Sequence, residues 1–150
     1  MLLYLHGFTS GPQSVKAQAL GRRMAERGLA TDFVCPQLPA SPAAAIALAE
    51  DLIRRHLEKV GAGETAIDRA NTSEAAESAT KPRILLAGSS LGGFYATWLA
   101  EKYDLRAVLI NPAVVARLSL ENFVGPQRWL YTGEPFEFTH RHIEELRALE

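Results

Sequence analysis

The residues best suited to chemistry in this 150-residue sequence are those of Gly88-Ser89-Ser90-Leu91-Gly92. This G-x-S-x-G pattern ends an apolar run and opens a helical pattern, which is the context of a nucleophile elbow. In such a turn the serine has a positive φ, and its hydroxyl stands clear of the sheet. We predict that Gly88 and Gly92 are needed because any side chain would collide with the strand or the helix. Ser90 is then the nucleophile, and the backbone N–H of Leu91 is one half of an oxyanion hole.

The same pattern has simpler interpretations. It also fits an ordinary Gly-Ser turn between a strand and a helix, or an anion-binding loop. Its position between the two predicted elements favours the elbow.

The segment His6-Gly7-Phe8 follows another apolar run and can supply the second donor of that hole. Hydrolases take this donor from a loop after a neighbouring strand, and His-Gly-x is a usual sequence for such a loop. We predict that the donor is the backbone N–H of Phe8, with Gly7 as the glycine of the loop. The imidazole of His6 is structural in this interpretation. Alternatively, His6 only ends a strand and binds loop carbonyl groups.

An acid and a base for Ser90 are harder to find. His140 and His142 lie two positions apart at the start of a helix, so they face different sides of it. This spacing argues against a metal pair. Three carboxylates in this half of the chain are best interpreted as surface charge: Asp104, Glu134 and Glu137.

Aromatic residues divide into two groups. Three follow the elbow at helical spacing and are expected to pack in the core: Phe94, Tyr95 and Trp98. Four others fall on loops at the carboxyl ends of the predicted strands and are candidates for the lining of an acyl pocket: Phe8, Phe123, Trp129 and Phe136.

The elements that must position these residues follow from the hydrophobic pattern. Apolar runs predict strands at residues 2–5, 33–35, 83–87 and 106–110. Helical patterns begin after Ser14, after Ser41, at Leu91 and near Thr139, and the stretch between Pro112 and Thr139 is expected to be irregular. This alternation is typical of an α/β fold with a mostly parallel sheet and helices on both faces. We predict one domain over residues 1–150, with a flexible insertion at about 61–82.

Composition excludes several classes of protein. The net charge of −1 leaves no basic surface for nucleic acid or an anionic membrane. The apolar stretches are too short for a membrane span, and no signal peptide precedes His6. The single cysteine, Cys35, cannot form an internal disulfide, which suits a cytoplasmic location.

Several blocks, in this order along the chain, resemble the YqiA-like family of small bacterial esterases, which are compact, nearly lidless α/β-hydrolases. The resemblance implies a Ser-Asp-His triad, short-chain carboxylic esters as small-molecule substrates, and no metal or organic cofactor. It rests on these blocks: Leu3-Tyr4-Leu5-His6-Gly7-Phe8, Pro36-Gln37-Leu38-Pro39, residues 88–99, Asn111-Pro112-Ala113-Val114 and Tyr131-Thr132-Gly133.

The resemblance also implies a difference. The family carries its acid and base in blocks that come after the position matching Glu150, so we expect this chain to be C-terminally truncated and to lack the last strands of the sheet. Hydrolysis through an acyl-Ser90 intermediate is then expected to be slow, with self-association through the exposed sheet edge. The alternatives are a non-catalytic fragment or pseudoenzyme, and a thioesterase or acyl transferase using the same nucleophile.

Overall fold

The computed structural model describes residues 1–63 and 84–150, and a parallel sheet forms its centre. The strands are β1 (Leu2–Leu5), β2 (Phe33–Val34), β3 (Leu85–Ser89) and β4 (Arg106–Ile110). Their order is β2-β1-β3-β4, and each neighbouring pair is parallel. The mostly parallel α/β sheet predicted from the sequence is therefore confirmed, although the third strand begins two residues later than expected.

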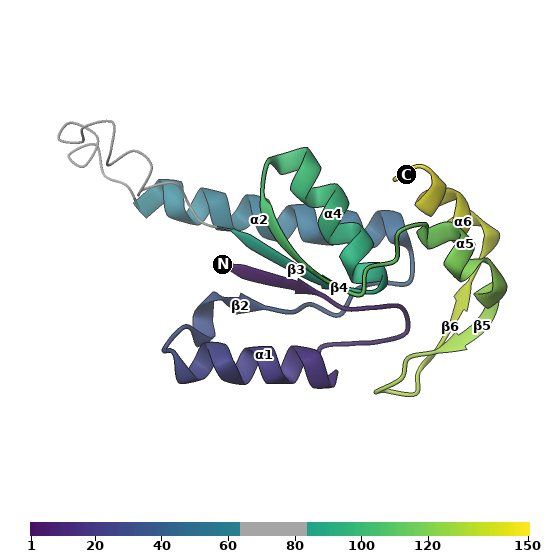
Figure 1. Ribbon diagram of the computed structural model, residues 1–150, viewed down its shortest axis with the longest axis horizontal. Coiled ribbons are helices and arrows are strands. Elements are labelled where there is room, and N and C mark those ends of the chain that lie inside the picture. The colour runs from purple at the N-terminus through teal and green to yellow at the C-terminus, as the bar shows by residue number, and fades with distance from the viewer. Residues whose placement is uncertain (64–83) are drawn as a thin grey trace.

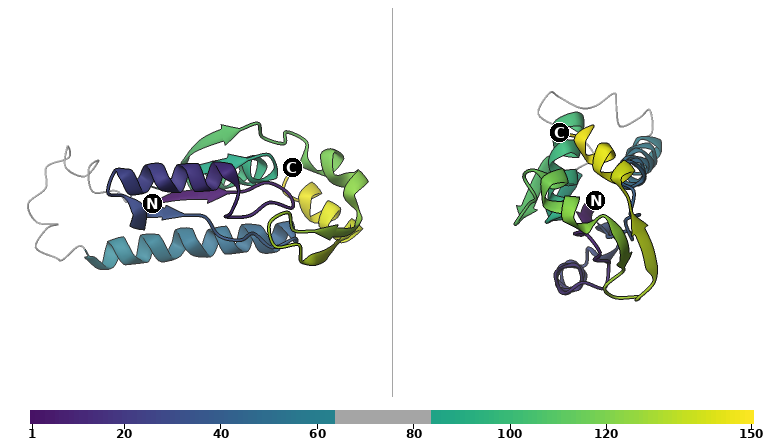
Figure 2. Two further views of the ribbon diagram at one scale, coloured as in Figure 1. Left: turned by 90° about the horizontal axis from the view of Figure 1, so that it is seen from below. Right: turned by 90° about the vertical axis from the view of Figure 1, so that its right-hand side faces the viewer.

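Helices cover both faces of this sheet because side chains alternate along β1. Leu3 and Leu5 pack with α2 (Pro42–Gly63) and α4 (Leu91–Tyr103) on one face. Leu2 and Tyr4 pack with α1 (Val15–Glu26) on the other. Figure 1 and Figure 2 show α1 alone on its side of the sheet, opposite α2 and α4. Within the described part of the chain, no helix is both long and apolar enough to cross a membrane.

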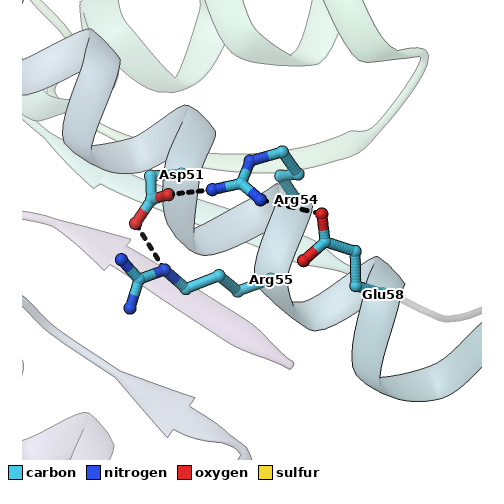
Figure 3. Close-up of polar contacts among 4 residues, drawn as sticks. All are labelled: Asp51, Arg54, Arg55 and Glu58. Atoms are coloured by element: carbon cyan, nitrogen blue, oxygen red, sulfur yellow. Dashed lines mark hydrogen bonds and ion pairs between the residues drawn. The ribbon is translucent and has the colours of Figure 1, made fainter. Parts of the chain in front are cut away.

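The outer face of α2 carries a network of charged side chains. Arg54 forms ion pairs with Asp51 and Glu58, and Arg55 pairs with Asp51, all within one or two turns of the helix (Figure 3). Exposed ion pairs of this kind each stabilise a helix by only about 0.3–0.5 kcal/mol. They identify this face as solvated, while the apolar positions of α2 turn towards the sheet.

The predicted insertion at about 61–82 begins within the last turn of α2, because residues 61–63 still belong to this helix. A single glycine weakens a helix by only about 1 kcal/mol and does not end it. Residues 64–82 of the predicted insertion lie outside the described residues.

The region expected to be irregular contains an antiparallel hairpin, so that expectation is wrong. Strands β5 (Gly125–Arg128) and β6 (Pro135–Phe138) pair with each other, and α5 (Ala116–Leu120) precedes them. A proline lies in each strand, and each strand is only four residues long, so the local sequence gives little indication of a hairpin. The final helix, α6 (His140–Arg147), begins after Thr139 as predicted.

The outer edge of the sheet is β4, which pairs only with β3 among the described residues. Val108 is 50% exposed and Leu109 is 43% exposed, whereas β1 is fully buried. An apolar strand with unpaired backbone groups is a template for another chain. Self-association through this edge stays a prediction.

Candidate active site

The backbone of Ser90 has the conformation of a nucleophile elbow. Its φ is +53° and its ψ is −121°, and α4 begins at the next residue. The Ser90 N–H donates to the carbonyl of Ile110 at 3.1 Å, while its own carbonyl accepts from Gly93 at 2.9 Å and from Ala113 at 3.0 Å. A positive φ at a non-glycine residue persists only where the surroundings enforce it. These bonds to β4 and α4 enforce it here, and the predicted positive φ is confirmed.

The glycines on both sides of Ser90 are required by contact with other backbone segments. A Cβ on Gly88 would overlap the carbonyl of Gly92, on the first turn of α4. A Cβ on Gly92 would overlap the carbonyl of Leu5, at the end of β1. The predicted collisions with the helix and the strand are therefore both present.

The loop after β1 lies against Ser90. A Cβ on Gly7 would lie 3.2 Å from the Cβ of Ser90, so the loop approaches closely only because Gly7 has no side chain. The next residue is Phe8, and its N–H has no hydrogen-bond partner among residues 1–63 and 84–150. The same holds for the N–H of Leu91. Two available donors thus belong to the two segments that meet at Ser90.

The imidazole of His6 holds the loop that contains Gly7 in place through two hydrogen bonds. His6 is only 2% exposed. Its Nε2 accepts from the N–H of Leu38 at 2.9 Å, so the proton is on Nδ1, which donates to the carbonyl of Gly7 at 2.9 Å. Burial lowers the pKa of His6, and the bond to Gly7 opposes this only in part. The ring is therefore a neutral structural link between the Gly7 loop and the segment after β2.

This arrangement predicts a pH-dependent stability. The unfolded chain protonates His6 at about 6.5, whereas the folded chain resists protonation, so the contribution of His6 is complete above that pH and is lost as the pH falls towards the lowered folded pKa. In His6→Gln this contribution disappears, and the free energy of unfolding above pH 6.5 falls by about 1–3 kcal/mol because the ring that joins the Leu38 N–H to the Gly7 carbonyl is lost. Urea denaturation across this pH range measures both effects.

His140→Gln is the matched control. His140 is exposed at the start of α6 and, in the described part of the chain, forms no hydrogen bond with the loop, so this substitution should leave the free energy of unfolding almost unchanged. An unchanged pH dependence in His6→Gln would show that His6 does not carry the effect.

Within the described residues, no histidine forms a hydrogen bond with the Ser90 hydroxyl. All four histidines of the sequence are among the described residues, and no hydrogen bond within residues 1–63 and 84–150 ends on the Ser90 hydroxyl. His140 begins α6, and the Nδ1 of His142 accepts from the N–H of Thr139 at 3.2 Å, completing a capping box. The three carboxylates interpreted as surface charge are all exposed: Asp104, Glu134 and Glu137. Within the described residues, no group of three His, Cys, Asp or Glu side chains could hold a metal ion.

Ser90 opens onto a hollow of about 370 Å³ at the carboxyl edge of the sheet. The hollow is lined from three directions, by the ends of β1 and β3, by the start of α1 and by the turn of the β5–β6 hairpin. Its lining residues are Tyr4, Gly7, Phe8, Ser10, Ser14, Val15, Lys16, Ser89, Ser90 and Tyr131.

Lys16 and Tyr131 line the hollow, and neither was predicted as a site residue. Tyr131 reaches the hollow because the Leu130 N–H donates to the carbonyl of Thr9 at 2.8 Å, which ties the hairpin turn to the loop after β1. A turn signal was present in Gly133, whose φ is +72°. The signal for Lys16 was its place two residues after the Ser14 cap, near the carboxyl end of β1.

Most of the loop aromatic residues pack on one another and do not reach the hollow. The Phe8 ring contacts Phe138 at a centroid distance of 4.9 Å, and its contacts with Phe123 and Phe136 are at 5.6 and 6.0 Å. Trp129 stacks on Phe136 at 4.5 Å. Of the four residues predicted as acyl-pocket candidates, only Phe8 lines the hollow with Ser90. Phe94 and Tyr95 are buried in the core, as predicted.

The sequence also matches the model of a protein family. Residues 1–64 and 64–150 match the family described as Uncharacterised protein family (UPF0227).

Proposed function

The chain belongs to the YqiA-like family UPF0227, and we propose that it is a serine hydrolase that forms an acyl-Ser90 intermediate from short-chain carboxylic esters. The observation that carries the proposal is the elbow conformation of Ser90, whose exposed hydroxyl lies in a hollow of about 370 Å³. A strained backbone of this kind is typical of functional sites. The unpaired Cys35 thiol fits a cytoplasmic location for this activity.

The proposed reaction has two stages. The Ser90 oxygen attacks the ester carbonyl, and the N–H groups of Phe8 and Leu91 bind the oxyanion that forms. The C–O bond to the alcohol then breaks, and the alcohol leaves with the proton that came from the serine. Water next attacks the acyl-serine, releasing the acid and restoring Ser90. This scheme uses no metal ion or organic cofactor.

One observation favours a second candidate function. None of the four histidines bonds to Ser90, so no imidazole activates its hydroxyl in this chain. A protein that binds esters in the same hollow without turning them over fits this equally well. The two candidates differ in whether a covalent bond to Ser90 forms.

An alkyl fluorophosphonate distinguishes them. If Ser90 is a nucleophile, its oxygen displaces fluoride from phosphorus, HF is lost, and peptide mapping by mass spectrometry finds one phosphonyl group on Ser90. The adduct should be absent from Ser90→Ala and retained in the matched control Ser119→Ala, which alters an exposed serine on α5. Absence of any adduct after long incubation would refute the nucleophile and favour the binding protein.

A further inference from the structure

The hollow beside Ser90 has a single charged residue in its lining, Lys16. Lys16 is the second residue of α1 and is exposed to solvent. It forms no ion pair with any carboxylate in residues 1–63 or 84–150. Its ammonium group is therefore available to a ligand that occupies the hollow.

The rest of the lining reinforces a preference for negative charge. No carboxylate lines the hollow. The polar groups around it are the hydroxyls of serine and tyrosine residues, which can donate hydrogen bonds to an anion. One of them, Ser14, already accepts from the N–H of Ala17 at 3.3 Å and so keeps its own proton for a further partner. Lys16 is therefore the one formally charged residue in this lining, although the whole chain has a net charge of −1.

The reacting group and the cation share this one space. Ser90 and Lys16 line the same hollow, and Tyr131 completes it from the hairpin turn. A small ester whose carbonyl carbon is held at Ser90 therefore occupies the same hollow that Lys16 lines. A carboxylate attached to either side of such an ester would be attracted to the ammonium group, and solvent weakens this attraction because Lys16 is exposed.

We propose that the Ser90 site selects anionic esters, in which a carboxylate close to the ester bond pairs with Lys16. This inference rests on the proposed function, since it names the substrate class for the same site. An exposed ion pair is weak, so the preference over a neutral ester of equal size is about two- to fivefold in affinity. Added salt should reduce it, as it does for other solvent-exposed pairs.

Two matched pairs of esters test the proposal on Ser90→Ala, in which bound esters stay intact. For an anion on the acyl side, the pair is ethyl hydrogen succinate and ethyl butyrate, whose alkyl ester bonds are stable in solution. For an anion on the alcohol side, the pair is 4-acetoxybenzoate and its methyl ester. We expect the anionic member of at least one pair to bind more tightly in calorimetric titrations, and the pair that responds identifies the side that carries the charge.

Charge variants then show whether Lys16 is responsible. In the Ser90→Ala background, Lys16→Gln should abolish the preference and Lys16→Glu should reverse it. Lys59→Gln, which removes an exposed lysine from α2 away from the hollow, should leave it unchanged. Equal affinity within both pairs, or a preference that survives Lys16→Gln, would overturn the inference. Either result leaves the proposed function intact, because covalent labelling of Ser90 is measured separately with a neutral reagent.

Discussion

Gly92→Ala should strongly destabilise the native fold. The added Cβ would overlap the carbonyl of Leu5, which is backbone at the end of the central strand β1 and cannot turn aside as a side chain would. Relief of the overlap requires α4 to move away from β1. That movement would separate the buried side chains of α4, such as Leu99, from the core. We expect a loss of about 3 kcal/mol or more, a large fraction of the stability of a domain of this size.

Circular dichroism and urea denaturation of the purified variant measure this loss. Gly28→Ala is the control for backbone strain, because Gly28 has a positive φ of +72°, unlike Gly92 in α4, and an added Cβ there meets nothing within 4 Å. Strain alone should cost about 1–2 kcal/mol in that variant. If Gly92→Ala were no less stable than Gly28→Ala, close contact between α4 and β1 would not be what requires a glycine at position 92.

The parts of the fold that the sequence predicts are those where local pattern and burial agree. Leu2–Leu5 is an unbroken apolar run, and it is buried on both faces between α1 and the pair α2 and α4. The elbow was predictable for a similar reason. Its glycines are fixed by backbone contacts, and those contacts hold whatever the surrounding side chains are.

The β5–β6 hairpin could not be predicted in the same way. It contacts the rest of the protein through the rings of Phe8, Phe136 and Phe138, which are distant in sequence. Its strands contain Pro126 and Pro135, residues that argue against a strand when the local sequence is considered alone. Lys16 and Tyr131 were missed as site residues for the same reason. Only the tertiary structure brings the start of α1 and the hairpin turn to one hollow.

4-Nitrophenyl acetate should acetylate Ser90 slowly, at a rate that rises in proportion to hydroxide concentration. Without a bonded base, the hydroxyl must lose its proton to solvent, and its ordinary pKa lies far above neutrality. The N–H groups of Phe8 and Leu91 still stabilise the oxyanion in the proposed mechanism. The remaining acceleration over water is then about 10³- to 10⁴-fold, the range seen when triad members are removed.

The pH dependence of this reaction tests how Ser90 is activated. Release of 4-nitrophenolate, with mass spectrometry of the acetylated peptide, should give one acetyl group per chain in the wild type and none in Ser90→Ala. His140→Gln changes an exposed histidine at the start of α6 and should leave the rate unaltered at every pH. A rate that falls in His140→Gln would contradict the prediction. Such a fall would mean that this imidazole reaches the Ser90 hydroxyl, although no hydrogen bond joins the two in the described residues.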